Sequence, residues 1–405
     1  MSLEIRAIRE EEREEAIQLW CTVWGGESSK PYFSRYFYGD VEWLPYYTIV
    51  ALLDGKMVSA VQVCKRIVPV GDYRLTMGGI ANVATLPEHR GKGYNTECLK
   101  KAIEVMEADA MDFSLLFTGI NPYYARLGYC DLPATFFAGK IRDDFSPSTT
   151  PYTVRLANAQ DLPFLFQIYS IYNSTRPITV QRSEAYWRDW IGISADKIPE
   201  NLFVAESARG EIVGYVRVGH FSSAVPYNEN EVEARIIEYG SDPLDSEAIA
   251  TALLEEVTGR VLGAGTHRLV ASLPKEPALQ SALAKILESV ETRTSGSAMF
   301  RLLHTTNLFK SLTFTMNDRW IEAGRPQGSL TFETPYGATR INATGDFLTI
   351  TLEDNPSEAL TQSAFFALLF GISTPESLTS DPLTQNLMRS LFAPHSPTYW
   401  GADGF

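Results

Sequence analysis

Two glycines and two basic residues lie close together in the segment Val83–Tyr94, Val-Ala-Thr-Leu-Pro-Glu-His-Arg-Gly-Lys-Gly-Tyr. Gly91 and Gly93 have no Cβ atom, so an anion can approach the backbone N–H groups there, and the basic side chains add positive charge. A helix expected over Tyr94–Glu107 contributes the unpaired N–H groups of its first turn. The pattern predicts a site for a phosphate or pyrophosphate group. A strand-to-helix turn that needs glycine for steric reasons alone is the alternative.

The elements after this loop indicate which fold surrounds it. Residues 112–118 are predicted as a short buried strand, and 119–122 as a break. Residues 123–129, Tyr-Tyr-Ala-Arg-Leu-Gly-Tyr, then fit a single helical turn that ends at a glycine. This succession resembles the acyl-CoA core of the GNAT N-acetyltransferases, in which the first strand splays from the next to admit the pantetheine arm. Glu88 stands where that family usually has Gln or Arg, so the prediction relies on the basic side chains and the backbone.

The overall composition limits the partners and the compartment. The 405 residues include 35 basic and 49 acidic side chains, and the formal net charge of −14 argues against nucleic acid or an anionic membrane as a partner. That charge suits a cationic substrate. The four cysteines are widely spaced, without a Cys-x-x-Cys pair, and the histidines are not clustered, so neither a disulfide framework nor a metal site is expected. With no secretory signal and no apolar run long enough to cross a bilayer, we expect a cytoplasmic protein.

An internal repeat organises the first two thirds of the chain. The strand 5–7, Ile-Arg-Ala, recurs as Val-Arg-Leu at 154–156, and the strand–turn–strand segment 50–63 recurs at 204–218. Two matching pairs of elements imply two copies of one fold. The second copy has the acidic turn Gly240–Asp245 at the position of the glycine loop, and like charges there would repel a pyrophosphate. We therefore expect the second copy to keep the fold without binding CoA.

The pattern changes from about residue 295. Short strands are expected at 299–303, 330–332, 340–342 and 347–352, followed by an apolar helix at 360–370 and a weaker one at 382–389. The whole chain thereby resembles the Eis (enhanced intracellular survival) family of acetyltransferases, whose members have two GNAT-like domains and a domain similar to sterol carrier proteins. The residues that carry the match are Val83–Thr85, Arg90–Thr96, Tyr124, Gly128, Tyr129, Gln362–Gly371 and Asp403–Phe405.

This resemblance implies a fold class and three domains. The class is α/β and α+β, with a catalytic GNAT domain over residues 1–150, a degenerate GNAT-like domain over 151–294 and a sterol-carrier-like domain over 295–405. By the same resemblance we expect an acetyl-CoA-dependent N-acetyltransferase that acts on primary amines such as those of aminoglycosides, polyamines or lysine side chains. We also expect a homo-oligomer, which is a hexamer in that family.

The resemblance also assigns site residues. Tyr124 is the expected general acid, because a phenol with a pKa of about 10 can protonate a departing thiolate without being ionised at rest. The expected general base is the α-carboxylate of Phe405, brought from the third domain into the first. No histidine offers itself as the base, since His89 lies in the loop and the other four have no paired carboxylate nearby in sequence; these are His220, His267, His304 and His395. The residues expected to hold acetyl-CoA are Val83, Ala84, Thr85, Arg90, Gly91, Lys92, Gly93, Tyr94, Asn95, Thr96, Gly119 and Ile120.

Two other functions stay open at this point. An apolar-ligand-binding protein would use the helices of residues 360–390 to line a cavity, and a scaffold without catalysis would follow if Glu88 abolished CoA binding. Tyr123 is expected to point elsewhere than Tyr124, since adjacent helical residues face about 100° apart. The aromatic residues near the N-terminus are predicted to lie in the core, although they would also fit a pocket for a cation; they are Trp20, Trp24, Tyr32, Phe33, Phe37 and Tyr38.

Overall fold

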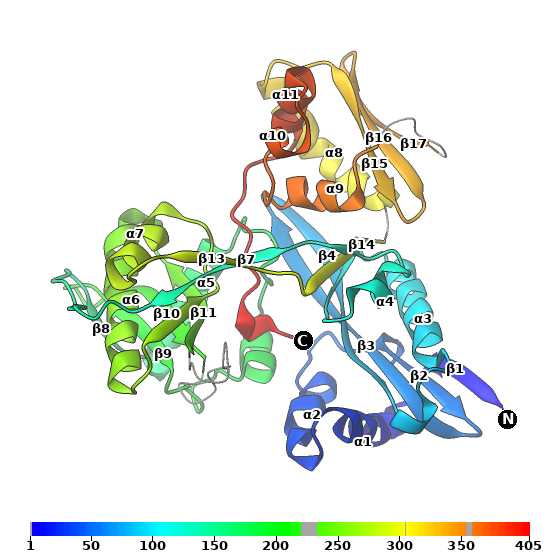
Figure 1. The fold of residues 1–405 in the computed structure, drawn as a ribbon, viewed down its shortest axis with the longest axis horizontal. Coiled ribbons are helices and arrows are strands. Elements are labelled where there is room, and N and C mark those ends of the chain that lie inside the picture. The colour runs from blue at the N-terminus through cyan, green and yellow to red at the C-terminus, as the bar shows by residue number, and fades with distance from the viewer. Residues whose placement is uncertain (1, 220–232, 304, 354–358) are drawn as a thin grey trace. The chain divides into compact units, whose positions relative to one another are not determined.

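The computed structural model describes residues 2–219, 233–303, 305–353 and 359–405, which form two compact units (Figure 1). The first unit runs up to residue 132 and includes residues 296–395 and 405. The second unit consists of residues 133–295 and 396–404. None of the helices in the described ranges is both long and apolar enough to cross a membrane.

The first unit is built on a seven-stranded sheet in the order β1-β2-β3-β4-β5-β14-β6. Strands β4 and β5 are parallel, and the other neighbours are antiparallel. The strands are β1 (Leu3–Ala7), β2 (Thr48–Leu53), β3 (Lys56–Val70), β4 (Tyr73–Thr85), β5 (Phe113–Phe117), β6 (Cys130–Asp131) and β14 (Ala298–Leu302). The strands expected after the glycine loop and at about residue 300 are thereby confirmed.

Helices cover both faces of this sheet. Val50 of β2 belongs to the apolar cluster of α1 and α2, whereas its neighbour Ile49 belongs to the cluster of α3. Because successive strand residues point to opposite faces, α1 and α2 lie on one face and α3 on the other. The helix expected after the glycine loop is therefore confirmed. These helices are α1 (Arg13–Trp24), α2 (Lys30–Tyr38) and α3 (Tyr94–Ala108), and the short α4 (Asn121–Ala125) follows β5.

The second unit contains a sheet with the same order and directions of strands, β8-β9-β10-β11-β12-β7-β13. Here β11 and β12 are the parallel pair, and the other neighbours are antiparallel. The segments of the predicted repeat occupy equivalent strands, since 5–7 lies in β1 and 154–156 in β8. The elements are β7 (Ala134–Lys140), β8 (Thr153–Leu156), α5 (Leu162–Tyr172), a π-helical turn (Tyr186–Ile191), β9 (Leu202–Glu206), β10 (Ile212–Val218), β11 (Glu233–Ser241), α6 (Ser246–Gly263), β12 (Arg268–Ala271), α7 (Pro277–Ile286) and β13 (Glu291–Ser295).

The two sheets exchange one strand each. Strand β7 follows β6 along the chain but pairs with β12 and β13, whereas β14 follows β13 but pairs with β5 and β6. The chain therefore changes units at residues 133 and 296. The domain boundaries expected at residues 150 and 294 stay a prediction, and the first of them lies beyond the exchanged strand β7.

An arginine and a carboxylate six residues apart recur in both units. Arg6 donates two hydrogen bonds of 2.7 Å to Glu12, and Arg155 donates hydrogen bonds of 2.7 and 2.8 Å to Asp161. Each carboxylate also accepts a hydrogen bond from the backbone N–H three residues before it. Each pair joins the first strand of the copy to the turn that starts its first helix. The repeat therefore includes the ion pair that connects the first strand of each copy to the start of its first helix.

Replacing Glu12 with Gln is expected to lower the free energy of unfolding at pH 7 by about 1–3 kcal/mol, because a charge-assisted hydrogen-bonded pair is lost. The hydrogen bonds from Arg6 lower the pKa of Glu12 to about 2. A lowered folded-state pKa contributes stability above the unfolded value of about 4.3, and this contribution disappears as the pH falls towards 2. Urea denaturation should therefore show a smaller difference at pH 3 than at pH 7.

A matched control for this experiment is Glu10→Gln, because the Glu10 side chain is 69% exposed beside Arg13. Exposed ion pairs contribute little, so this variant should unfold almost like the parent protein at both pH values. An equal destabilisation by Glu12→Gln at pH 7 and pH 3 would contradict the role given to its charge.

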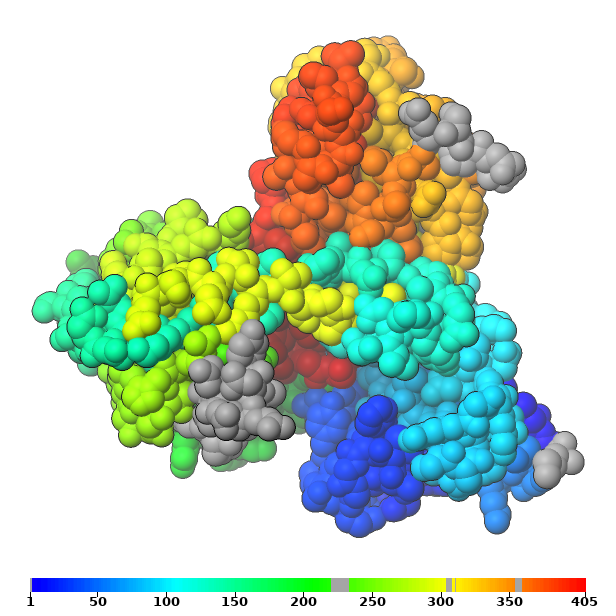
Figure 2. All heavy atoms as spheres, in the orientation of Figure 1, coloured from blue at the N-terminus to red at the C-terminus, as the bar shows by residue number. Residues whose placement is uncertain are grey.

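The rest of the first unit is an α+β segment, whose atoms gather in one body in Figure 2 (yellow to red-orange). Gln362 joins it to the sheet, since its side chain accepts from the N–H of Leu302 at 2.7 Å and donates to the carbonyl of Gly128 at 3.0 Å. The expected strands and helices are confirmed, whereas α8 was not predicted because its threonines and asparagines weaken the helical signal. The elements are α8 (Thr305–Glu322), β15 (Gly328–Thr334), β16 (Gly337–Thr344), β17 (Phe347–Glu353), α9 (Gln362–Leu369), α10 (Pro375–Leu378) and α11 (Pro382–Leu391).

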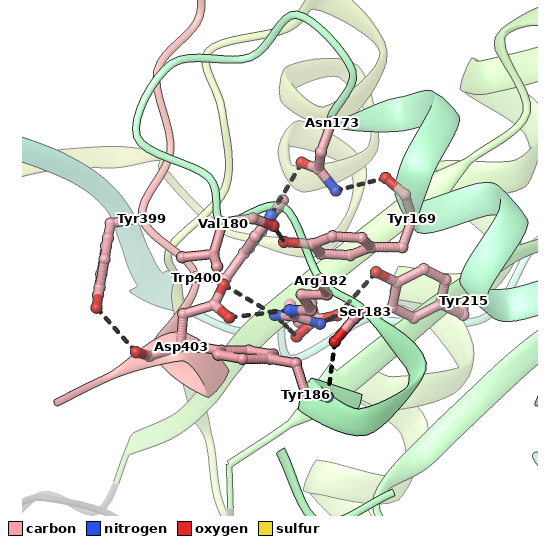
Figure 3. A network of polar contacts seen from close by, with 11 residues as sticks. Tyr169, Asn173, Val180, Arg182, Ser183, Tyr186, Tyr215, Tyr399, Trp400 and Asp403 are labelled. Atoms are coloured by element: carbon pink, nitrogen blue, oxygen red, sulfur yellow. Dashed lines mark hydrogen bonds and ion pairs between the residues drawn. The ribbon is translucent and has the colours of Figure 1, made fainter. Parts of the chain in front are cut away.

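A buried ion-pair network holds residues 396–404 within the second unit (Figure 3). The guanidinium of Arg182 donates to Glu238 at 2.8 and 2.9 Å and to Asp403 at 2.9 Å, and all three side chains are at most 1% exposed. The rings of Tyr169 and Trp187 lie 4.0 and 4.2 Å from this guanidinium. Two carboxylates and two aromatic faces thus compensate the desolvation of the buried arginine. Because Asp403 is one of these partners, the network holds residues 396–404 in place.

Candidate active site

A cavity opens where β4 and β5 separate. Their parallel pairing is confined to Met77–Gly79 and Phe113–Leu115, although β4 continues to Thr85 and β5 to Phe117. The cavity has a volume of about 1360 Å³ and is lined by both strands beyond this pairing, by the glycine loop, by α4 and by residues of α1 and α2. The splayed pair of strands that the resemblance implies is therefore present.

The glycine loop lines this cavity with Gly91 and Gly93. Gly91 and Gly93 have φ angles of +75° and +83°, and no atom lies within 4 Å of the place where a Cβ would be. Gly93 precedes α3, and no side-chain cap occupies the N–H groups of its first turn. Arg90 lines the cavity as well and donates to the carbonyl of Thr85 at 3.3 Å. This arrangement fits the pyrophosphate of an acyl-CoA molecule.

The cavity brings together the residues that the sequence singled out, with one exception. Lys92 is exposed and does not line it, and neither does the exposed Glu88. Glu88 thus places no negative charge in the cavity wall. The predicted residues that line the cavity are Val83, Ala84, Thr85, Arg90, Gly91, Gly93, Tyr94, Asn95, Thr96, Gly119, Ile120, Tyr124 and Phe405.

Tyr124 is a buried phenol at the cavity wall. Its side chain is 7% exposed, and its ring meets those of Tyr123 and Tyr129 edge-on, with centroids 5.0 and 6.2 Å away. Burial raises the pKa of Tyr124 well above its usual value, so the hydroxyl stays protonated at neutral pH. Tyr123 also lines the cavity, but its ring is turned 85° from that of Tyr124 and its hydroxyl lies 3.1 Å from that of Thr96.

Phe405 lies in the same cavity, against the point where the two strands begin to separate. Its ring centroid is 5.9 Å from that of Phe117. A Cβ on Gly79 would come within 2.3 Å of the ring, so only glycine leaves room for Phe405 here. Phe405 belongs to the first unit although residues 396–404 belong to the second.

A β-bulge in β4 was not predicted from the sequence. Two residues of β4, Asn82 and Val83, stand opposite the single Val61 of β3, and Asn82 has a φ angle of +52°. The side chain of Asn82 donates to Gln62 at 3.0 Å, and Gln62 is fully buried. A bulge leaves one residue outside the ladder, and both bulge residues line the cavity. A possible signal was asparagine within an otherwise apolar strand.

The aromatic residues of α1 and α2 divide into two groups. Trp20 and Phe37 are 0% and 5% exposed, as expected for core residues. Trp24, Tyr32 and Tyr38 are 59%, 46% and 59% exposed, so the core prediction is wrong for them. Trp24 and Tyr32 line the cavity, whereas Tyr38 does not. Phe33 both packs in the core and lines the cavity. Trp24, Tyr32 and Phe33 were not among the residues that the sequence analysis assigned to catalysis or to acetyl-CoA binding.

Sequence comparison identifies the type of domain that holds this cavity. A family described as acetyltransferase (GNAT) domain matches residues 4–130, which include every lining residue except Phe405. N-alpha-acetyltransferase 30 of Schizosaccharomyces pombe is 31% identical over 116 residues, which are 27% of this chain and 75% of that protein.

Solved structures resemble the chain over nearly its whole length. A probable N-acyltransferase from Enterococcus faecalis has a TM-score of 0.69 at 16% identity and covers 98% of this chain and 99% of its own. A GCN5-related N-acetyltransferase from Anabaena variabilis has a TM-score of 0.69 at 13% identity, with 98% of each chain covered. Eis1 from Mycobacterium abscessus has a TM-score of 0.65 at 14% identity, with 99% of each chain covered. At these identities the likeness shows a shared fold.

Proposed function

The chain belongs to the GNAT acetyltransferases, and on that premise we propose that it transfers an acetyl group from acetyl-CoA to a primary amine, with Tyr124 as general acid and the α-carboxylate of Phe405 as general base. One observation carries the proposal. A single cavity between the splayed strands is lined by the glycine loop, by the buried phenol of Tyr124 and by Phe405. A pyrophosphate-binding loop and the two proton-transfer groups therefore share one space.

The proposed reaction is a direct transfer of the acetyl group from acetyl-CoA to the amine. Acetyl-CoA supplies the acetyl group as a thioester when it is bound. The neutral amine nitrogen forms a bond to the acetyl carbon, the carbon–sulfur bond breaks with its electron pair on sulfur, and Tyr124 donates its proton to that sulfur. The Phe405 carboxylate accepts the proton that the nitrogen loses and returns it to the Tyr124 phenolate. The products are the N-acetyl amine and the CoA thiol.

Two further features of the site support this assignment. The extra residue of the β-bulge at Asn82 and Val83 leaves a backbone N–H outside the ladder, and we propose that this donor stabilises the negative charge that develops on the acetyl oxygen. An α-carboxylate has an ordinary pKa of about 3.5, several units below that of an amine. The apolar side chains of Phe117 and Ile80 line the cavity as well, and apolar surroundings favour the neutral form of an amine, which is the form that attacks the acetyl carbon.

We also propose that the whole chain is a member of the Eis family, with a second GNAT-like domain over 151–294 and a sterol-carrier-like domain over 295–405, and that it forms a homo-oligomer, a hexamer as in that family. The matching strand order of the second sheet and the likeness to Eis1 support this. In the second copy the carboxylate of Asp242 accepts from the N–H of Leu244 at 2.8 Å, at the turn that corresponds to the glycine loop. A carboxylate placed there favours a domain that does not bind CoA.

The alternative of an apolar ligand in the α+β segment has less support. Phe365, Phe366 and Phe370 are 0% exposed. The ring of Phe365 packs on Phe309 and Phe332 inside that segment, whereas Phe366 and Phe370 pack on Phe113 and Phe300 of the seven-stranded sheet. A cavity of about 410 Å³ beside it is lined by Asp318 and Arg319 as well as by apolar residues. Charged walls of this kind do not suit an apolar ligand, so we do not propose one.

Release of CoA thiol from acetyl-CoA in the presence of primary amines tests the proposed function. We expect turnover by the parent protein and a rise of about tenfold in the KM for acetyl-CoA in Gly91→Ala, because a Cβ would enter the anion-binding loop. Gly55→Ala is the matched control, since Gly55 has a φ angle of +81° and open space around it but lies outside the cavity. No turnover on any amine, or equal KM values in the two variants, would contradict the proposal.

A further inference from the structure

The cavity has an aromatic wall on the side of α1 and α2. Trp24 is 59% exposed and Tyr32 is 46% exposed, although both line the cavity. Phe33 extends this wall into the core, where its ring packs on Tyr32 with centroids 5.1 Å apart. Large apolar side chains that stay half open to solvent at the rim of a cavity are typical of a binding surface.

This wall and the glycine loop lie towards opposite faces of the sheet. Phe33 packs in the cluster formed by α1 and α2, whereas Tyr94, which begins the helix after the loop, packs against the cluster of α3. Since these helices cover opposite faces, the cavity passes between β4 and β5 from one face to the other. If the pyrophosphate binds at the glycine loop as proposed, the aromatic wall on the other face is left for the acceptor.

The charges around the cavity do not suit an acceptor with several positive charges. Among the described residues that line it, none is Asp or Glu, and the charged side chains are those of Arg90 and Arg126. The one negative group that we propose for the cavity is the α-carboxylate of Phe405. One face of the Tyr32 ring is already covered by the guanidinium of Arg35, at 4.6 Å from the ring centroid. A polycation would lose hydration here without gaining a carboxylate partner for each charge.

We propose that the acceptor is a primary amine carried by an aromatic or similarly flat apolar group, with no second positive charge. Its apolar group packs on Trp24 and Tyr32, and its amine reaches the acetyl group beside Phe405. The proposal rests on the proposed acetyltransferase function and narrows its substrate class from the aminoglycosides and polyamines that the overall charge suggested. Aromatic packing and apolar burial supply the binding energy, and the single amine remains the reactive group.

Initial rates of thiol release over a panel of amines separate the possibilities. The panel contains 2-phenylethylamine and tryptamine as aromatic monoamines, n-propylamine as a small monoamine, and spermidine and kanamycin as polycations. We expect kcat/KM for the aromatic monoamines to exceed that of every other compound by at least about tenfold, which corresponds to the packing of one ring.

Substitutions in the wall show whether the preference arises there. Trp24→Ala should raise the KM for 2-phenylethylamine about tenfold, while the KM values for n-propylamine and acetyl-CoA change less than about twofold. Tyr38→Ala is the matched control, because Tyr38 is also 59% exposed and belongs to α2 but does not line the cavity. Calorimetric titration of 2-phenylethylamine into the CoA-saturated protein should show the same loss of affinity in Trp24→Ala, independently of turnover.

The outcomes distinguish this proposal from the proposed function. Preference for spermidine or kanamycin, or an equal effect of Trp24→Ala on propylamine and phenylethylamine, would overturn the substrate class while the acetyltransferase function stands. Absence of turnover on every amine, with acetyl-CoA still bound, would overturn both. Selective turnover of the aromatic amines that depends on Trp24 and not on Tyr38 would support both.

Discussion

Conversion of the α-carboxylate of Phe405 to an amide lowers kcat about a thousandfold, if this group accepts the proton from the amine as proposed. The amide keeps the ring against Phe117, at 5.9 Å between centroids, and keeps the shape of the terminus. It removes only the negative charge and the proton acceptor. We therefore expect an unchanged KM for acetyl-CoA, and the unfolding temperature shows whether the fold is kept. Rates from thiol release, together with a thermal unfolding curve, measure all three quantities.

A second variant tests whether catalysis depends on the position of Phe405, without changing its carboxylate. A Cβ on Gly79 would lie 2.3 Å from Cζ of Phe405, so Gly79→Ala must displace the ring. We expect this variant to lose about a hundredfold in kcat, because a small displacement of a reacting group costs that much. In a Phe405→Ala background the same glycine substitution should cost little, since the clash is gone, and this non-additivity identifies the contact. A fully active amide would show that the carboxylate is not the base.

The secondary-structure elements that surround the candidate site and are local in sequence were predicted well. The glycine loop, the helix that begins at Tyr94 and the strand Phe113–Phe117 follow one another within about 35 residues, and the helix and strand were found where expected. Their determinants are short-range, because glycine spacing, helical periodicity and a compact apolar run act on neighbouring residues. Tyr124 came with this segment, four residues before the glycine that ends the turn.

Most parts that depend on distant segments were not predicted, and the place of Phe405 was expected only from the family resemblance. The local sequence does not reveal that β7 and β14 are exchanged between the two sheets, because the residue preferences of a strand do not depend on which strand it pairs with. The bulge at Asn82 is a matter of register between β3 and β4, which a single strand does not encode. Trp24 and Tyr32 have the spacing of core residues, and only the opening between β4 and β5 leaves them at a cavity.

The net charge of the whole chain was likewise a poor guide to the charges around the cavity. The net charge of −14 favoured a cationic acceptor for the chain as a whole, yet the described residues around the cavity place only arginines among their charged side chains. Acidic residues occur instead in surface pairs such as Lys100 with Glu97 and Lys140 with Glu288. Net charge describes the field around a protein at a distance, whereas an acceptor is selected by the groups that touch it.

Replacing Tyr124 with Phe is expected to lower kcat about a hundredfold and to leave the KM for acetyl-CoA unchanged, because the lost hydroxyl acts only when the thiolate departs. The ring remains, so its packing with Tyr129 and the stability of the fold should persist. Tyr123→Phe is the matched control. Its hydroxyl lies beside Thr96 in the same cavity, and its removal should change kcat less than about threefold.

The pH dependence gives Tyr124 a second test with a definite sign. Burial raises the pKa of its phenol above the usual value of about 10, so the acid form is present at all lower pH values and is lost only above that raised pKa. The rate of the parent protein should therefore keep rising towards pH 10 as the amine loses its proton, without a falling limb. A falling limb between pH 7 and 9 that Tyr124→Phe abolishes would mean that the phenol ionises in the working range. Tyr124 would then be poorly suited as the acid, because part of it would already have lost the proton that the departing sulfur requires.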